Sequence, residues 1–194
     1  MKIDIILAGV GGQGILSIAT ALGAAVLSEK LNLKQAETHG MSQRGGAVVS
    51  HMRISSEEIA SDLIPAGGAD IILSVEPMEA LRYLPFLSES GFVVTSINPF
   101  ENIPNYPAIE SILAELKALP RIIAIDADML AREAGHFRTS NMVMLGAASP
   151  FIPISFDTIE EGIRSIFGRK GEDVVEMNLK ALRAGRKFAE ENRN

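Results

Sequence analysis

The chain has 194 residues, of which 47% are hydrophobic and 22% charged, so its composition excludes intrinsic disorder and predicts a sizeable buried core. Its net charge of -6 provides no general basic field, and we expect neither nucleic acid nor a membrane as a partner. The absence of cysteine excludes disulfides, thiolate nucleophiles and sulfur-ligated clusters built by this chain. The length predicts a single domain over residues 1–194.

The first apolar run extends from Ile3 to Val10, with Asp4 inside it and glycines after it. It is too short to span a membrane and lacks the basic start of a signal peptide, so we predict a cytoplasmic protein. The three histidines, His39, His51 and His136, are not spaced like the ligands of a compact metal motif. We therefore expect no metal site in this chain.

Short apolar runs bounded by Gly, Pro, Asp or Asn recur along the chain, as is typical of strands buried on both faces. We predict such central strands at Ile3–Ala8, Ile71–Val75, Phe92–Ile97 and Ile122–Ile125. We predict helices at Ile15–Leu31, Met78–Leu87, Ile109–Ala118, Ala127–Glu133, Met142–Ala148 and Thr158–Phe167. The alternation of strands and helices predicts a three-layer, Rossmann-like α/β fold.

Two segments, Gln35–Thr38 and Ala47–Ile54, are predicted to be strands joined by a loop instead of a helix. The sheet is therefore expected to be mixed but mainly parallel. In the second segment the residue types alternate with a period of two. This pattern places Met52 on the core side and His51 and Arg53 on the wetter side.

The last segment, Glu172–Asn192, has apolar residues near helical spacing, with acidic residues first and basic residues later. It predicts a long amphipathic C-terminal helix. Its apolar stripe either covers the core of this domain, which we favour, or docks on a partner subunit.

A glycine-rich turn follows the first strand and opens the first helix. The turn is Gly9-Val10-Gly11-Gly12-Gln13-Gly14, in the context that the dinucleotide-binding fingerprint requires. Glycines permit a sharp turn, and the free amides of the helix start favour an anion such as a phosphate. The alternative is a tight turn that holds no ligand, and the small residues of the following helix explain glycine by close packing alone. Packing does not require the Gln13 amide, which is free to form hydrogen bonds there.

A nicotinamide dinucleotide also requires an acidic residue at the end of the second strand, about 20 positions on. Glu29 comes too early and is expected on the helix, whereas Glu37 comes late and is followed by another glycine loop. The sequence therefore disfavours this ligand.

The second glycine-rich loop concentrates polar side chains between two predicted strands. It reads His39-Gly40-Met41-Ser42-Gln43-Arg44-Gly45-Gly46. Ser42, Gln43 and Arg44 offer donors suited to a carboxylate, a phosphate or backbone carbonyls across an interface. We favour an interface or an anion-facing role over a plain turn. For His39 alone, a contact with the local backbone and a role in proton transfer remain open.

Taken together, these motifs resemble the gamma-type domain of the 2-oxoacid:ferredoxin oxidoreductases. The resemblance rests on Leu7–Gly14, on Ala36–Gly46, on Asp126-Ala127 and on Asn141–Ala147, and it spans nearly the whole chain. The His-Gly-Met-x-Gln-Arg-Gly-Gly form is most like the beta subunit of the indolepyruvate branch.

The resemblance implies the small subunit of an enzyme that decarboxylates an aryl 2-oxoacid, forms the acyl-CoA and reduces ferredoxin. It also implies a large alpha subunit that carries thiamine diphosphate, Mg²⁺ and the iron–sulfur clusters, while this chain binds no cofactor alone and its catalytic residues remain unknown. The candidates for the subunit cleft are Gly9, Gly11, Gly12, Gln13, Gly14, His39, Ser42, Gln43, Arg44, Gly45, Gly46 and Asn141. Asn141 either caps the helix Met142–Ala148 or turns its amide toward the cleft. The alternative function is a stand-alone nucleotide- or CoA-binding module.

Overall fold

The computed structural model describes residues 1–40, 45–101 and 103–193. In these residues, six strands form one sheet in the order β2-β3-β1-β4-β5-β6. The strands are β1 (Lys2–Val10), β2 (Asn32–His39), β3 (Ala47–Ser55), β4 (Ala69–Ser74), β5 (Leu87–Ser96) and β6 (Ile122–Ile125). Strands β1, β4, β5 and β6 run parallel, whereas β3 is antiparallel to both β1 and β2. The prediction of a mixed, mainly parallel sheet is confirmed.

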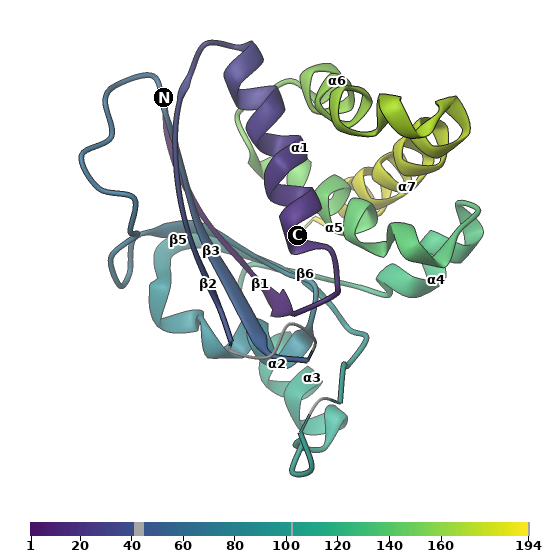
Figure 1. Ribbon diagram of the computed structural model, residues 1–194. Helices are drawn as coiled ribbons and strands as arrows, with labels where there is room; N and C mark the ends of the chain where they lie inside the picture. Colours follow the sequence, from purple (N-terminus) through teal and green to yellow (C-terminus); the bar gives the residue numbers. More distant parts are fainter. Residues whose placement is uncertain (41–44, 102, 194) are drawn as a thin grey trace.

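Helices cover both faces of this sheet (Figure 1). They are α1 (Ile15–Ser28), α2 (Pro77–Arg82), α3 (Ile109–Lys117), α4 (Ala127–Glu133), α5 (Ser140–Ala148), α6 (Phe156–Phe167) and α7 (Glu172–Glu191). Short 3₁₀ turns lie at Leu84–Phe86, Phe137–Thr139, Ser149–Phe151 and Gly168–Lys170. One core joins the sheet to α1 and α4–α7, and a smaller core on the other face joins it to α2 and α3. The predicted three-layer architecture is confirmed.

The C-terminal helix α7 belongs to the larger core. Its apolar stripe includes Val175, Leu179 and Leu182, and each of these side chains is at most 1% exposed because it packs against the rest of the chain. The stripe therefore covers this domain's own core, and the alternative of a partner contact through the same stripe is wrong. None of the described helices combines the length and hydropathy needed to cross a membrane.

Two predicted helices were too long. The first ends at Ser28 and not at Leu31, because Lys30 takes a positive φ of 57° and turns the chain into β2. The helix predicted at Met78–Leu87 ends at Arg82 and is followed by a 3₁₀ turn that contains Pro85. Proline has no N–H to continue the helix, and the chain enters β5 at Leu87.

The outer face of β3 is more covered than the sequence suggested. Met52 and Ile54 are fully buried, and His51 and Arg53 are more exposed, as the alternation predicted. However, His51 Nδ1 accepts a hydrogen bond from the Ile64 amide at 3.1 Å, and its ring meets Phe86 edge-on. Burial lowers the pKa of His51 below its ordinary value, so the imidazole is neutral at pH 7. Segment 56–68 therefore covers this face of the strand.

Candidate functional site

A cleft lies at the carboxyl ends of the parallel strands. The connection after β1 goes to the α1 face, and the connection after β4 goes to the α2 face, so the two diverge at a topological switch point. Open α/β sheets bind their ligands at such points. The cleft has a volume of about 790 Å³ and is bordered by the glycine turn, the ends of β4 and β5, the start of α4, segment 136–141 and α7.

The glycine turn needs its glycines for different reasons. Gly12 and Gly14 adopt φ angles of 102° and 83°, which favour glycine. At Gly9 a Cβ atom would come within 2.4 Å of Val75 Cγ2, so close approach to the β4 end requires glycine there. The Gly11 amide donates to the Gly46 carbonyl at 2.8 Å, and the Gly45 amide donates to the Gly11 carbonyl at 3.4 Å. The fold thus brings the two glycine-rich segments together.

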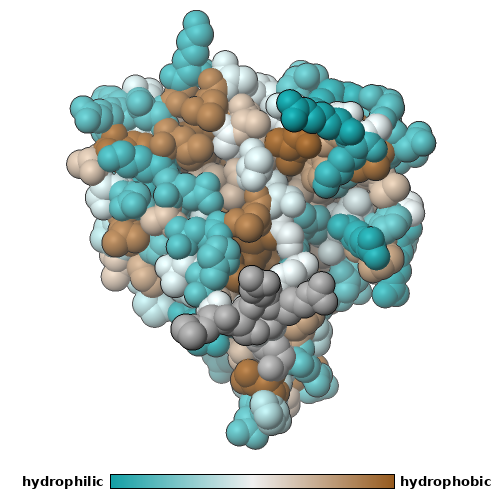
Figure 2. Space-filling view, in the orientation of Figure 1, coloured by the Kyte–Doolittle hydropathy of each residue, from teal (hydrophilic) through white to brown (hydrophobic). Residues whose placement is uncertain are grey.

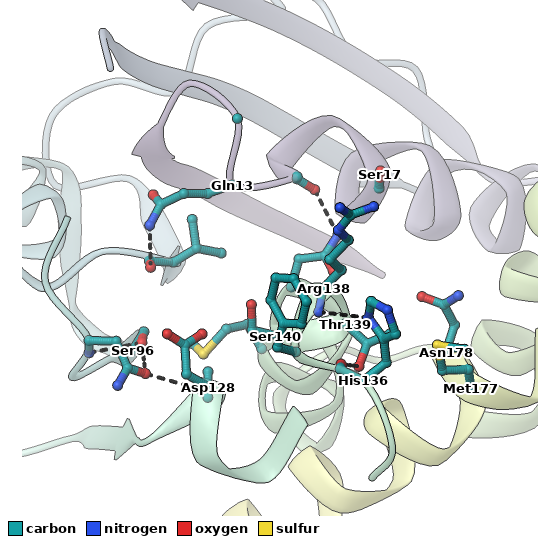
Figure 3. A pocket seen from close by; sticks show the side chains of 18 of the residues that line it. Gln13, Ser17, Ser96, Asp128, His136, Arg138, Thr139, Ser140, Met177 and Asn178 are labelled. Atoms are coloured by element: carbon teal, nitrogen blue, oxygen red, sulfur yellow. Dashed lines mark hydrogen bonds between the residues drawn. The ribbon is translucent and has the colours of Figure 1, made fainter. Parts of the chain in front are cut away.

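Gln13 spans the switch point. Its Oε1 atom accepts from the Val10 amide at 2.8 Å, and its Nε2 atom donates to the Val75 carbonyl at 3.3 Å (Figure 3). The side chain thereby ties the end of β1 to the end of β4. This bridge explains why an amide stands where packing alone does not require one.

Asn141 holds the turn from the opposite side. It lies within α5 and is 8% exposed, and Thr139 occupies the N-cap position that the sequence had considered for Asn141. Its Nδ2 atom donates to the Gly14 carbonyl at 3.1 Å, and its Oδ1 atom accepts from the Met142 amide. Asn141 therefore lies inside the helix instead of capping it, and its amide nitrogen bonds to the glycine turn that borders the cleft.

The second glycine-rich loop is described only in part. Met41, Ser42, Gln43 and Arg44 lie outside the described residues. His39 is half exposed and its Nε2 atom contacts the Glu37 carboxylate, so this contact is with a side chain and not with the local backbone. His39 and Gly40 border a second cavity of about 560 Å³, on the other side of the glycine turn from the cleft.

Apolar side chains line much of this second cavity. Val10, Ile15, Leu16 and Val48 contribute to it, and Figure 2 shows a hollowed strip of apolar surface at the centre of this face. Leu16 is 49% exposed. The glycine turn therefore separates a cleft with charged and polar lining residues from a mostly apolar cavity.

Segment 136–141 supplies cleft residues that the sequence reasoning missed. His136 follows α4 after Ala134 and Gly135; its Nδ1 atom accepts from the Arg138 amide at 3.1 Å, and its ring stacks on Phe137. Arg138 and Lys170 bring positive charge to the lining, and Asp128 brings a negative one. Figure 3 shows Gln13 and Ser17 from the α1 side, Ser96 from the end of β5, Asp128 from the start of α4, and Met177 and Asn178 from α7. Within this segment, the sequence had singled out only Asn141 as a candidate for the cleft.

The cleft is suited to an anionic ligand. The N-cap residues of α1 and α5, Gly14 and Thr139, both line it, and neither makes a side-chain capping bond. Amides at helix starts attract anions, although the Met142 amide of α5 already donates to Asn141 Oδ1, and Arg138 and Lys170 add formal charge to that attraction. Among the described residues, no group of three or more His, Asp or Glu side chains is arranged to hold a metal ion.

The geometry disfavours a nicotinamide dinucleotide, as the sequence did. Strand β3 lies between β1 and β2, so Glu37 on β2 is separated from the glycine turn by two strand spacings, about 10 Å. Glu29 caps the end of α1 and accepts a hydrogen bond from Thr158 Oγ1 at 2.9 Å. Neither carboxylate is placed to bind a ribose at the turn.

Replacing Gly14 with alanine should destabilise the turn by about 2–3 kcal/mol, of which the left-handed backbone accounts for about 1. The new Cβ atom would lie 2.5 Å from Asn141 Nδ2 and would displace its hydrogen bond. Denaturant unfolding measures the loss. Gly12→Ala is the matched control, because Gly12 also has a positive φ but has no atom within 4 Å of the built Cβ. Equal losses in the two variants would show that backbone strain alone matters.

An open, mainly parallel sheet with a glycine-rich turn and a cleft at its switch point defines a Rossmann-like ligand-binding domain, with the β2–β3 pair beside β1. Residues 4–188 match the family described as pyruvate ferredoxin/flavodoxin oxidoreductase, and the chain belongs to this family. The family resemblance seen in the sequence is thereby confirmed.

Known proteins resemble this chain along nearly its whole length. It is 39% identical over 201 residues to the indolepyruvate oxidoreductase subunit IorB of Pyrococcus horikoshii, covering 98% of both chains. It is 38% identical to the IorB subunit of Archaeoglobus fulgidus, covering 95% of this chain and 94% of that one. Among solved structures, the 2-oxoglutarate:ferredoxin oxidoreductase of Magnetococcus marinus matches with a TM-score of 0.77 and 25% identity, covering 98% of this chain and 31% of that chain.

Proposed function

We propose that this chain is the small subunit of an indolepyruvate-type 2-oxoacid:ferredoxin oxidoreductase. The enzyme would convert an aryl 2-oxoacid and CoA to the acyl-CoA and CO₂ and pass the electrons to ferredoxin. The observation that carries the proposal is the end-to-end match to IorB subunits, at 39% identity over 98% of both chains.

We assign the redox and thiamine chemistry to a large alpha subunit. An iron–sulfur cluster is held by cysteine thiolates, and this chain has no cysteine. Among the described residues, no group of three or more His, Asp or Glu side chains is arranged to hold a metal ion, and we assign magnesium and thiamine diphosphate to the large subunit as well. The isolated chain should therefore be inactive.

The contribution of this chain would be the cleft at the switch point. CoA carries phosphates, and the uncapped starts of α1 and α5 together with Arg138 and Lys170 offer the groups that bind phosphate. In this proposal the cleft receives the phosphate-bearing part of CoA, and the partner holds the 2-oxoacid at the thiamine. Gln13 and Asn141 act by fixing the glycine turn.

The large subunit would dock on the rim of this cleft. Phe100 and Phe137 line the cleft and are 42% and 55% exposed, and Met129, beside the lining residue Asp128, is 47% exposed. Large exposed apolar side chains of this kind form the anchors of protein interfaces. Docking there would close the cleft against the partner.

The test is co-expression with a cluster-bearing large subunit from the same source. The expected result is a stable brown complex that reduces ferredoxin with an aryl 2-oxoacid and CoA, while the isolated chain is colourless and inactive. Failure to associate with any such subunit would contradict the proposal. A panel of 2-oxoacids would then establish the preferred substrate.

The docking rim has a test of its own in the same complex. Phe137→Asp should weaken assembly by about tenfold or more. Leu63→Asp is the matched control, because Leu63 is 57% exposed and its carbonyl accepts from Arg53, which pairs with Asp4 at the end of β1 opposite the glycine turn. Equal weakening by both substitutions would place the interface elsewhere.

The second candidate function is a stand-alone nucleotide- or CoA-binding module, which the anion-suited cleft favours. It requires that the chain be purified from its source without a large subunit and that NAD(H), ATP or CoA raise its melting temperature alone. A thermal-shift panel on the isolated chain distinguishes the two candidates.

A further inference from the structure

Glu76 is a fully buried carboxylate that lies two residues after the end of β4, at the switch point. It is the N-cap of α2, and its Oε2 atom accepts from the Glu79 amide at 2.8 Å. Capping alone does not call for a carboxylate, since Ser155 performs the same task for α6 with one hydroxyl. A buried charge is costly unless it is well hydrogen-bonded, so the second oxygen needs an explanation.

The second oxygen of Glu76 holds a different segment. Its Oε1 atom accepts from the Phe100 amide at 3.3 Å and from the Tyr106 hydroxyl. Arg82, the nearby cation, pairs with Glu79 at 2.9 Å instead. Burial and the Glu76 charge raise the pKa of Tyr106 well above its ordinary value, so the phenol stays a donor at neutral pH.

The segment held in this way forms a wall of the cleft. Asn98, Pro99 and Phe100 all line it. At one end of this wall, Asn98 Nδ2 donates to Asp126 Oδ1 at 3.0 Å. At the other end Phe100 is 42% exposed, so burial of its own side chain does not fix it, and the hydrogen bond from its amide to Glu76 does.

Two adjacent residues therefore hold opposite walls of the cleft. The Val75 carbonyl receives Gln13 of the glycine turn, and the Glu76 carboxylate receives Phe100 and Tyr106. We propose that Glu76, with Tyr106, is a positioning residue that sets the distance between the Asn98–Phe100 wall and the glycine turn. The kinetic consequence rests on the proposed function, in which this cleft receives CoA.

The first test uses the isolated chain and needs no partner. Tyr106→Phe removes one donor to Glu76 and keeps the ring, and Glu76→Gln removes the charge and keeps a capping oxygen. Both should speed hydrogen exchange at the Phe100 amide by about tenfold, the effect of a weakened hydrogen bond. Tyr83→Phe alters the only other tyrosine of the chain and should leave this amide unchanged. Unaltered exchange in both test variants would overturn the proposal.

The second test measures kinetics of the assembled complex, with CoA and the aryl 2-oxoacid varied separately. Tyr106→Phe should raise KM for CoA by about tenfold and leave kcat and the KM for the 2-oxoacid within about twofold, because only the wall of the CoA cleft has moved. Tyr83→Phe should match the wild type. An equal fall of kcat and rise of both KM values would instead show a general structural defect and overturn the positioning role. An inactive wild-type complex would count against the proposed function, while the exchange measurement would still decide whether Glu76 holds the wall.

Discussion

Gly185→Ala is expected to destabilise the protein by about 3–5 kcal/mol, enough to lower the melting temperature by about 6–20 °C. Gly185 of α7 lies against α5, and a Cβ atom there would come within 1.9 Å of the Val143 carbonyl oxygen. The contact is reciprocal, because a Cβ atom on Gly146 of α5 would come within 1.9 Å of the Leu182 carbonyl oxygen. Alanine improves helix propensity by about 1 kcal/mol, which is too little to offset a clash with backbone.

The control is Gly168→Ala at the end of α6. Gly168 has a φ of -53° and no atom within 4 Å of the built Cβ, so the substitution should be neutral within about 0.5 kcal/mol. Calorimetry of the variants measures both effects. If Gly185→Ala had the same melting temperature as the wild type, the inference that α5 and α7 cross in close contact would be wrong. Because both helices line the cleft, a wider crossing would also change the shape of the cleft.

Arg53→Ala should cost about 3 kcal/mol, because it leaves Asp4 buried without its main cation. Asp4 is 1% exposed, and both of its carboxylate oxygens accept from Arg53, at 2.8 and 2.9 Å. Arg53 Nη1 also donates to the carbonyls of Ser61 and Leu63 and so anchors segment 56–68. Lys2, whose Nζ atom lies 3.2 Å from Asp4, is largely exposed and compensates only in part.

Two further variants show where the loss of stability in Arg53→Ala comes from. Arg164→Ala removes an arginine whose acidic partners are exposed, and it should cost less than about 1 kcal/mol. Asp4→Asn in the Arg53→Ala background removes the unpaired charge and should recover part of the stability. If urea unfolding showed no recovery, the loss would come from segment 56–68 and not from the buried charge.

Local sequence patterns were sufficient for most elements, and for the glycine turn. Apolar runs between breakers located the central strands, and a glycine cluster between a strand and a helix has few local alternatives. The predicted end of the helix Met78–Leu87 was wrong, because the apolar residues of Leu84–Leu87 fit the pattern of a buried helix as well as that of a buried strand. The pairing of β5 with β4 selected the strand for Leu87, which lies opposite Ala69 at a register shift between the two strands.

The glycine turn, its strand–helix context and the family were determined by the sequence alone, because they depend on neighbouring residues. Only the tertiary structure decided what the turn contacts. Asn141 reaches Gly14 across 127 residues, Gln13 reaches Val75 across 62, and Arg53 reaches Asp4 across 49. Such contacts depend on how helices and strands pack, and the periodicity of a sequence reports only which face of an element is buried. For that reason Glu76, Arg138 and Lys170 became candidates only once the fold had brought them to the cleft or its walls.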